Sequence, residues 1–330
     1  MKKVPIELVD FINTGSNFII AGHKEPDGDC IGSQLALCSA LRRFGKEALV
    51  CSPGPFKSSE IKKHEDQFIF DPDKIDKIAA ENTGTKAILV DCSTMERLGY
   101  LQKIIEKYPY AVIDHHSAVS HPQSTPETPI YIDSSASSCT ILIEKIINTL
   151  GLEITKEETD MLLFGLCTDT GFFRHLTDKN ADAFEAAAKM VRYGANPKEI
   201  YTLINGGKSL NSRILTGHIL SRTESFFDGK LLLSYETLQD HMAYGLEDRD
   251  SDVLNQLLQS VEGVEAIVII RQETVDNCSV SLRSFDKIDV AQIAASFGGG
   301  GHKNASGFVI KNELSNIKKI MLELFSEIFS

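Results

Sequence analysis

The chain has 330 residues, of which 42% are hydrophobic and 24% are charged, as is typical of a soluble globular protein long enough for two domains. Its formal net charge of -12 argues against a protein that binds long duplex nucleic acid through a broad basic surface. No apolar run is long enough to span a membrane, the N-terminal segment lacks the pattern of a signal peptide, and the cysteines form no CxxC pair. We therefore expect a cytoplasmic protein with reduced thiols and no membrane partner.

The first half of the chain alternates strand-like and helix-like segments. Short apolar runs, partly of β-branched residues, predict buried parallel strands at Ile19–Ala21, Ala48–Cys51, Ala87–Val90 and Ala111–Ile113. Helical periodicity lies between and after them, at about residues 31–44, 138–150, 156–168 and 178–193. This alternation predicts an α/β fold, in which a parallel sheet carries helices on both faces.

The pattern changes after the helix-stopping sequence GANP at 194–197. We expect a first domain over 1–195, a helical connector over 196–222 and a smaller α+β domain over 223–330. Strands of the last domain are predicted at Leu231–Tyr235, Val264–Arg271, Cys278–Arg283 and Gly307–Ile310. Most of their connections resemble hairpins, so we expect the helices of this domain on one side of its sheet.

Four segments of the expected first domain end in carboxylate or imidazole side chains. These side chains are His23, Asp27 and Asp29, then Asp91, then Asp114, His115 and His116, and finally Asp169. Each segment taken alone has an ordinary interpretation as a turn or helix cap. Because ligands bind beyond the carboxyl ends of the strands in open α/β sheets, we expect the segments to converge on one crevice. Convergence of all four favours a functional site.

The donor types in this group indicate a metal centre. Four carboxylates and two imidazoles stand out, namely His23, Asp27, Asp29, Asp91, His115 and Asp169. This mixture is too rich in oxygen for a structural zinc site and suits manganese, with magnesium as the alternative. So many carboxylates predict two cations bridged by a shared carboxylate, an arrangement typical of phosphoester hydrolysis.

Five motifs along the chain resemble those of the DHH phosphoesterases. In order they are HKEPDGDCIGS (23–33), VDCS (90–93), DHH (114–116), CTDTGFFR (167–174) and GGGGHKNASGF (298–308). The last is similar to the nucleotide-binding signature of the DHHA1 domain, so the resemblance spans nearly the whole chain. It implies a DHH domain that carries the metals and a DHHA1 domain that binds the substrate. The nanoRNase-type members that it suggests degrade nanoRNA and dinucleotides and dephosphorylate 3'-phosphoadenosine 5'-phosphate.

The resemblance also implies a role for each site residue. One manganese would have His23, Asp27, Asp91 and Asp169 as ligands. The second would have Asp29, Asp91, His115 and Asp169, with Asp91 as the bridge. His116 is expected to contact the substrate phosphate, so Asp91, His115 and His116 are the expected catalytic residues.

We expect the second domain to recognise the substrate. A run of glycines lets backbone N–H groups approach a phosphate closely, and an arginine can clamp it with two hydrogen bonds. The candidate contacts there are Arg283, Gly299, Gly300, Gly301, His302 and Asn304. Arg174 is a further candidate, although an ordinary surface ion pair explains it nearly as well.

The leading hypothesis is therefore a manganese-dependent hydrolase that acts on short oligonucleotides or nucleotide bisphosphates in an inter-domain cleft, either alone or as a homodimer. An inorganic pyrophosphatase-like hydrolase shares the first-domain motifs, but GGGGHKNASGF argues against it. A non-catalytic nucleotide or metal sensor is the alternative from another class. The complete set of expected ligands argues against a sensor, because a degenerate binding module would tolerate their loss.

Overall fold

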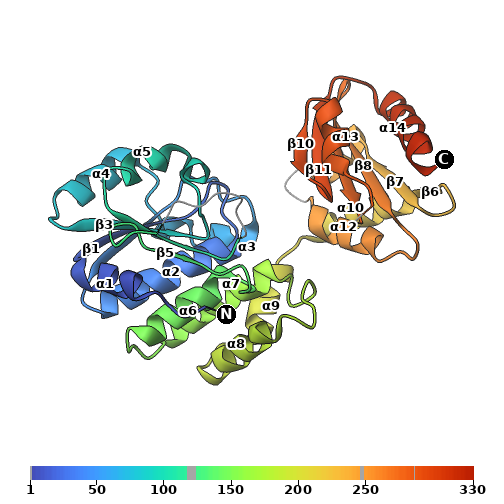
Figure 1. Ribbon diagram of the computed structural model, residues 1–330. Coiled ribbons are helices and arrows are strands. Elements are labelled where there is room, and N and C mark those ends of the chain that lie inside the picture. Colours follow the sequence, from blue (N-terminus) through green and yellow to red (C-terminus); the bar gives the residue numbers. More distant parts are fainter. Residues whose placement is uncertain (1, 117–123, 246–248, 286) are drawn as a thin grey trace. The chain divides into compact units, whose positions relative to one another are not determined.

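The computed structural model describes residues 2–116, 124–245, 249–285 and 287–330 (Figure 1). It divides into two compact units, Met1–Gly206 and Gly207–Ser330. The stretch 196–222, which we expect to connect the domains, contains α9 (Pro197–Asn205) in the first unit and α10 (Leu210–Ser221) in the second. None of the described helices has the length and apolar content that crossing a bilayer requires.

A parallel sheet of 5 strands forms the centre of the first unit, in the order β2-β1-β3-β4-β5. Its strands are β1 (Asn17–Ala21), β2 (Glu47–Cys51), β3 (Thr85–Val90), β4 (Tyr110–Asp114) and β5 (Ile130–Ile132). The four predicted strands lie within β1 to β4, so these predictions are confirmed. The analysis of periodicity missed β5, because three residues are too few to show a pattern.

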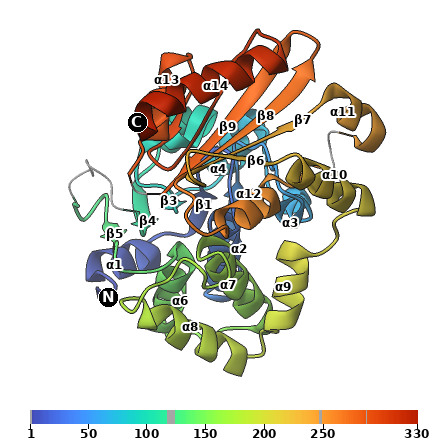
Figure 2. The same cartoon turned by 90° about the vertical axis from the view of Figure 1, so that its right-hand side faces the viewer.

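Helices cover both faces of this sheet, as predicted. Phe18 and Ile20 of β1 point into one core, whereas Ile19 and Ala21 point into the other, as the alternation of a strand requires. The first core is covered by α1 (Ile6–Thr14), α2 (Gly28–Arg43), α6 (Cys139–Thr149) and α7 (Lys156–Asp169), with α8 (Ala181–Arg192) and α9 packed against α7 (Figure 2). The second is covered by α4 (Pro72–Ala80), α5 (Gln102–Ile105) and the 3-10 helix η2 (Met95–Leu101). Two short elements, α3 (Ser59–Lys62) and η1 (Glu65–Gln67), lie between β2 and α4.

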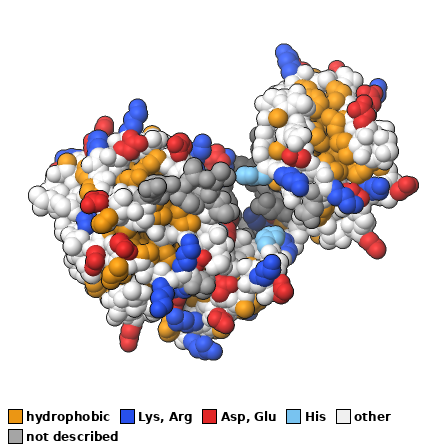
Figure 3. Space-filling view, viewed as in Figure 1, with side chains coloured by type: hydrophobic (Ala, Val, Ile, Leu, Met, Phe, Trp, Pro, Cys, Tyr) orange, Lys and Arg blue, Asp and Glu red, His pale blue; other side chains and the backbone are white. Residues whose placement is uncertain are grey.

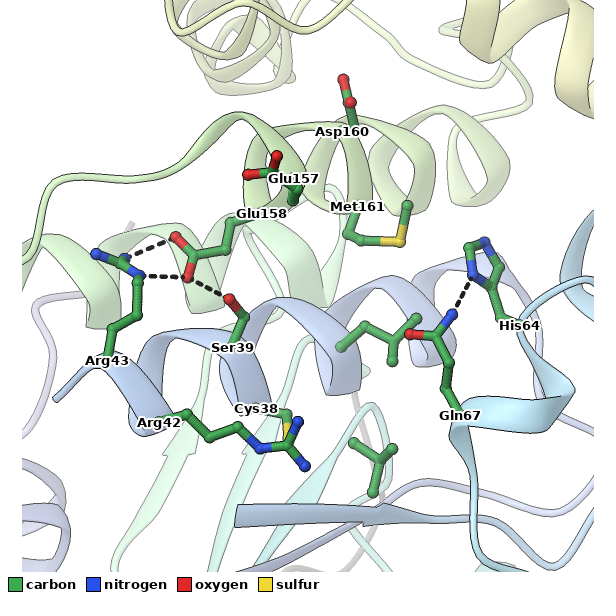
Figure 4. Close-up of a pocket in the computed structure, with 12 residues that line it drawn as sticks. Cys38, Ser39, Arg42, Arg43, His64, Gln67, Glu157, Glu158, Asp160 and Met161 are labelled. Carbon is green, nitrogen blue, oxygen red and sulfur yellow. Dashed lines mark hydrogen bonds and ion pairs between the residues drawn. The ribbon is translucent and has the colours of Figure 1, made fainter. Parts of the chain in front are cut away.

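An ion pair joins α2 to the start of α7. Glu158, which is 1% exposed, accepts hydrogen bonds from Arg43 and Ser39 of α2 (Figure 4). The same carboxylate completes a capping box with Thr155, which fixes the first turn of α7. A cavity of about 630 Å³ lies beside this pair, and none of the predicted site residues lines it. The opposite ends of the two helices carry the predicted metal ligands, so this packing fixes their separation.

The second unit contains a mixed sheet of 6 strands in the order β10-β11-β9-β8-β7-β6. Its strands are β6 (Glu224–Phe226), β7 (Leu231–Glu236), β8 (Ala266–Thr274), β9 (Asn277–Ser284), β10 (Gly300–His302) and β11 (Ala305–Ile310). The predicted hairpin between β8 and β9 is present. Strands β7 and β8 are parallel, so their connection has to cross over, and it contains α11 (Leu238–Tyr244) and α12 (Ser251–Gln259).

Helices cover both faces of this second sheet as well. Leu231 and Val268 face α13 (Val290–Ser296) and α14 (Leu314–Phe329), whereas Leu232 and Ile267 face α10 and α12. The prediction of helices on one side was therefore wrong. The parallel crossover between β7 and β8 explains the difference, because it places its helices on the face opposite to α13 and α14.

Candidate metal centre

Asp91 lies at the centre of the converging side chains. It follows β3 directly with a left-handed backbone (φ 55), which aspartate tolerates better than most residues, and its N–H donates to the carbonyl of Ile113 at 2.9 Å. Its carboxylate is 1% exposed. One oxygen, Oδ2, lies 3.4 Å from Nε2 of His23, and the other, Oδ1, lies 3.5 Å from Nε2 of His115. The carboxylate therefore presents one oxygen to each of two neighbouring groups of donors.

The first group consists of His23, Asp27 and the Oδ2 atom of Asp91. Nδ1 of His23 lies 2.9 Å from the carbonyl of Lys24, so it carries the proton and leaves the lone pair of Nε2 facing the carboxylates. Nε2 lies 4.0 Å from Oδ2 of Asp27. The other oxygen of Asp27 caps α2 by accepting the N–H of Cys30 at 3.0 Å, so the capping role and the position beside His23 coexist.

The second group surrounds His115. Its Nε2 lies 3.7 Å from Oδ2 of Asp29 and 3.7 Å from Oδ2 of Asp169, in addition to its contact with Asp91. The contacts of Asp169 thus place it with His115 and Asp29. The structure brings all six predicted ligands together in two groups that share Asp91.

Asp29 has a second partner that the sequence did not reveal. Its side chain is fully buried and accepts the backbone N–H groups of Cys139 at 2.6 Å and Thr140 at 3.0 Å, at the N-terminus of α6. A helix N-terminus stabilises a carboxylate through its free N–H groups and its dipole. Because these residues lie 110 and 111 positions away from Asp29, no local pattern could have predicted the contact.

The crowded carboxylates shift one another's protonation. Burial raises the pKa of Asp29 well above its ordinary value, and the charge of Asp91 raises it further. Burial also raises the pKa of Asp169 to about 6, although His115 opposes this shift. Burial would raise the pKa of Asp91 too, but contacts with His115, His116 and His23 lower it. A divalent cation would neutralise the same carboxylates that these histidines contact.

His116 differs from His115 in its environment. Its Nδ1 lies 2.8 Å from Oδ1 of Asp114, a fully buried carboxylate that also accepts the backbone N–H of His116 at 3.0 Å. The side chain of His116 is 44% exposed, so Nε2 is the ring nitrogen left for a ligand. The hydrogen bond that the ring donates to Asp114 and the contact with Asp91 raise the pKa of His116 to about 10. The imidazole is therefore a cation near the carboxylates, as a group that contacts phosphate should be.

Buried atoms without partners test whether a metal fits these groups. Among the buried side-chain atoms that make no hydrogen bond in the described part of the chain are Nε2 of His23, Oδ1 of Asp91 and Nε2 of His115. Unpaired buried polar atoms are rare in native proteins and call for an explanation. All three are predicted metal ligands, and His115 lies with Asp29 and Asp169 at separations that one cation can bridge. The donor set fits divalent cations.

In the second unit, the predicted substrate contacts gather at one end of the sheet. Arg283 of β9 and His302 of β10 both pair with Ala305 of β11, so their side chains share one face of the sheet, about 10 Å apart. His302 is exposed, and Arg283 is half-buried. The backbone carbonyl of Asn304 accepts the N–H of Ser284, which ties the segment after β10 to the end of β9.

The glycine run has a structural reason that the sequence did not reveal. Gly300 and Gly301 belong to β10 instead of an open loop, and Gly301 has a φ of 142. A Cβ atom on Gly299 would lie 2.2 Å from the carbonyl oxygen of Gly307, and one on Gly301 would lie 2.6 Å from that of Ala305. The close approach of β11 therefore requires glycine at both positions, whether or not a phosphate binds there. Arg174, in the first unit, is exposed and lies outside the donor groups.

Comparison with known proteins identifies both halves of the chain. Residues 17–166 match the DHH family, N-terminal domain, and residues 234–330 match the DHHA1 domain. The bifunctional oligoribonuclease and PAP phosphatase NrnA of Thermus thermophilus is 29% identical over 314 residues, which cover 93% of this chain and 89% of that protein.

Two solved structures share the fold. An exopolyphosphatase-related protein from Bacteroides fragilis aligns with a TM-score of 0.83 at 23% identity, over 98% of this chain and 96% of that chain. Exonuclease RecJ bound to manganese aligns with a TM-score of 0.52 at 14% identity, over 94% of this chain and 92% of that chain. The family assignment rests on the two domain matches, which together cover most of the sequence, and on the Thermus thermophilus relative: the chain belongs to the DHH and DHHA1 family of phosphoesterases, which are hydrolases of phosphoester bonds.

Proposed function

We propose that this protein hydrolyses short oligonucleotides, 3'-phosphoadenosine 5'-phosphate, or both, with two Mn²⁺ ions held by the six donors of the first unit. One observation carries the proposal: the Asp91 carboxylate presents one oxygen to the His23 group and the other to the His115 group. A carboxylate shared in this way is typical of two-cation phosphoesterases. The activity in the name of the Thermus thermophilus relative and the manganese in the RecJ structure support the substrate class and the metal, with Mg²⁺ as the alternative.

The predicted site residues of the first unit have separate tasks in this proposal. Two bound divalent cations would activate water and neutralise charge on the phosphoryl group. Asp91 fixes the spacing of the two donor groups, and His23 directs Nε2 into its group because the carbonyl of Lys24 holds Nδ1. His116 carries a proton and donates it in a hydrogen bond to a phosphate oxygen. Asp114 orients that imidazole.

The second unit supplies substrate contacts in this proposal, through Arg283, the segment 299–302 and Asn304. Short substrates agree with the surface charge, because most of their phosphates would meet cations and a few basic side chains. Basic and acidic side chains are interspersed on the face of each unit that Figure 3 shows. A long duplex would instead require a continuous basic surface. We also propose that the protein is cytoplasmic, because such short nucleotides arise in the cytoplasm.

A turnover panel tests the substrate class. The protein would be supplied with Mn²⁺ and offered 3'-phosphoadenosine 5'-phosphate, dinucleotides, five-residue RNA and DNA, and pyrophosphate. We expect cleavage of the bisphosphate, the dinucleotides or both. Cleavage of pyrophosphate alone would replace the proposal with the pyrophosphatase alternative, and tight nucleotide binding without turnover would replace it with the sensor.

The Asp91→Asn variant tests the shared carboxylate. We expect this variant to fold but to lose bound metal and nearly all hydrolysis, because neither donor group keeps an anionic oxygen from residue 91. Asp133→Asn is the matched control, since Asp133 also follows a strand of the same sheet and is 2% exposed, but contacts Lys2 and Ser135 instead of the donor groups. Metal content by atomic spectroscopy and turnover in Mn²⁺ are the measurements. Wild-type turnover in Asp91→Asn would contradict the two-cation centre.

A further inference from the structure

A cysteine lies within the His23 group. Cys30 is in the first turn of α2, fully buried, and its Sγ lies together with a ring nitrogen of His23 and a carboxylate oxygen of Asp91, all within 4.8 Å of one another. Gly22, directly after β1, lies against this sulfur, since a Cβ atom on Gly22 would lie 2.2 Å from Sγ. The S–H of Cys30 points to Oε1 of Gln34 at 3.6 Å. The sulfur is therefore fixed next to two predicted metal ligands.

The ring nitrogen of His23 that faces the predicted carboxylate ligands is Nε2, which lies 3.4 Å from Oδ2 of Asp91. His23 is 5% exposed, its Nδ1 is engaged by Lys24, and its buried Nε2 makes no hydrogen bond to any described residue. The two other thiols next to predicted ligands are directed elsewhere, since Sγ of Cys92 contacts the carbonyl of Thr94 and Sγ of Cys139 contacts that of Ile113. Within the described residues, Cys30 is the cysteine that joins a group of candidate metal ligands.

One imidazole, one thiol and one carboxylate form a donor set for a different class of cation. Manganese and magnesium prefer oxygen, whereas Zn²⁺ and Cd²⁺ prefer sulfur and nitrogen. We infer that Cys30, His23 and Asp91 form an inhibitory site for a thiophilic divalent cation. Binding of this cation displaces Mn²⁺ from the His23 group and stops hydrolysis. The inference rests on the proposed two-cation function, and it adds a ligand and a metal selectivity to that centre.

The chemical step of this binding is a simple exchange. A bond forms between the cation and Sγ of Cys30, the S–H bond breaks, and the proton leaves to solvent. The hydrogen bond to Gln34 is lost at the same time. Mn²⁺ prefers oxygen ligands to sulfur. It would therefore bind through His23, Asp27 and Asp91 and leave the thiol protonated.

Absorption spectroscopy tests the inference without any turnover. The metal-free full-length protein would be titrated with Cd²⁺, and in parallel with Co²⁺, while the sulfur-to-metal charge-transfer band is recorded. We expect a band that saturates at one thiolate per chain in the wild type and is absent in Cys30→Ser. Cys38→Ser is the matched control, because Cys38 is a buried cysteine of the same helix whose sulfur contacts the carbonyl of Ala48 instead. It should keep the band.

Inhibition of Mn²⁺-supported hydrolysis supplies the second measurement. The concentration of Cd²⁺ that halves the rate should rise by about tenfold or more in Cys30→Ser and stay unchanged in Cys38→Ser. A wild-type protein without the band, or a Cys30→Ser variant that keeps it, overturns the inference even if Mn²⁺ supports hydrolysis. Conversely, a Cys30-dependent band in a protein that cleaves none of the proposed substrates would overturn the function and leave the ligand assignment standing. The wild-type spectrum alone can reject the inference, so the test remains valid even if Cys30→Ser misfolds. Cys30→Ala is a second variant for the same measurement.

Discussion

Asp114 is a buried residue that acts through its neighbour. It is fully buried, and its Oδ1 holds both the backbone N–H and the ring Nδ1 of His116. A carboxylate in this position sets which ring nitrogen faces outward and favours the protonated ring. Its other oxygen, Oδ2, is buried and makes no hydrogen bond in the described residues. The side-chain contacts of Asp114 are therefore those that Oδ1 makes with His116. We therefore regard Asp114 as the residue that positions His116.

Replacing Asp114 with asparagine should move the pH dependence of substrate binding. In the wild type the hydrogen bond to Asp114 raises the pKa of His116, so we expect the imidazole to stay protonated and to bind phosphate into the alkaline range. Without the Asp114 carboxylate the pKa should fall toward about 6.5, and the affinity should be lost at a correspondingly lower pH. We expect the KM of Asp114→Asn to rise with pH from near neutrality, with metal content unchanged. A KM profile identical to that of the wild type would contradict this role.

At the scale of elements, the crossing of α2 and α7 sets the distance between Asp29 and Asp169. Gly165 of α7 lies against Asp29, and a Cβ atom there would lie 2.5 Å from Cγ2 of Thr140 and 3.0 Å from Oδ1 of Asp29. Both neighbours are fully buried, so neither can move freely. The two helices can approach this closely only because residue 165 has no side chain.

Gly165→Ala should therefore weaken the metal centre as well as the fold. We expect a loss of about 1–3 kcal/mol in the free energy of unfolding, which is typical of overpacking, and a lower affinity for Mn²⁺ because Asp29 is displaced. Gly217→Ala is the control, since Gly217 lies inside α10 with open space around it, and alanine there should stabilise by about 0.5–1 kcal/mol. Urea unfolding and Mn²⁺ titration measure the two effects. Unchanged Mn²⁺ affinity in Gly165→Ala would show that Asp29 does not depend on this packing.

The sequence predicts most of these elements, and the failures have physical causes. The strands β1 to β4 were visible because parallel strands buried on both faces form short, continuous apolar runs. The contact of Asp29 with the start of α6 was not visible, since it joins residues that only the folded sheet brings together. The motifs predicted that six donors converge, but not that Cys30 lies among them, because a cysteine in an apolar helix normally packs as a small hydrophobic residue.

At the scale of the whole molecule, each unit has its own hydrophobic core and its own share of the proposed chemistry. The first unit contains the metal donors, and the second contains Arg283 and His302 on one face of its sheet. This division predicts that catalysis and recognition can be separated by mutation. Binding contacts remote from the reacting phosphoryl group should affect large substrates and spare small ones.

Arg283→Ala in the full-length protein tests this separation. We expect the KM for a dinucleotide to rise about tenfold, because one charge-assisted phosphate contact is lost, while Mn²⁺ content and hydrolysis of the small artificial ester bis-p-nitrophenyl phosphate are unchanged. Lys311→Ala is the matched control, since it removes one positive charge from the same unit at an exposed position after β11, where the lysine pairs with Asp276. It should leave both substrates unaffected. If Arg283→Ala slowed both substrates equally, the second unit would be supporting the catalytic centre instead of binding the substrate.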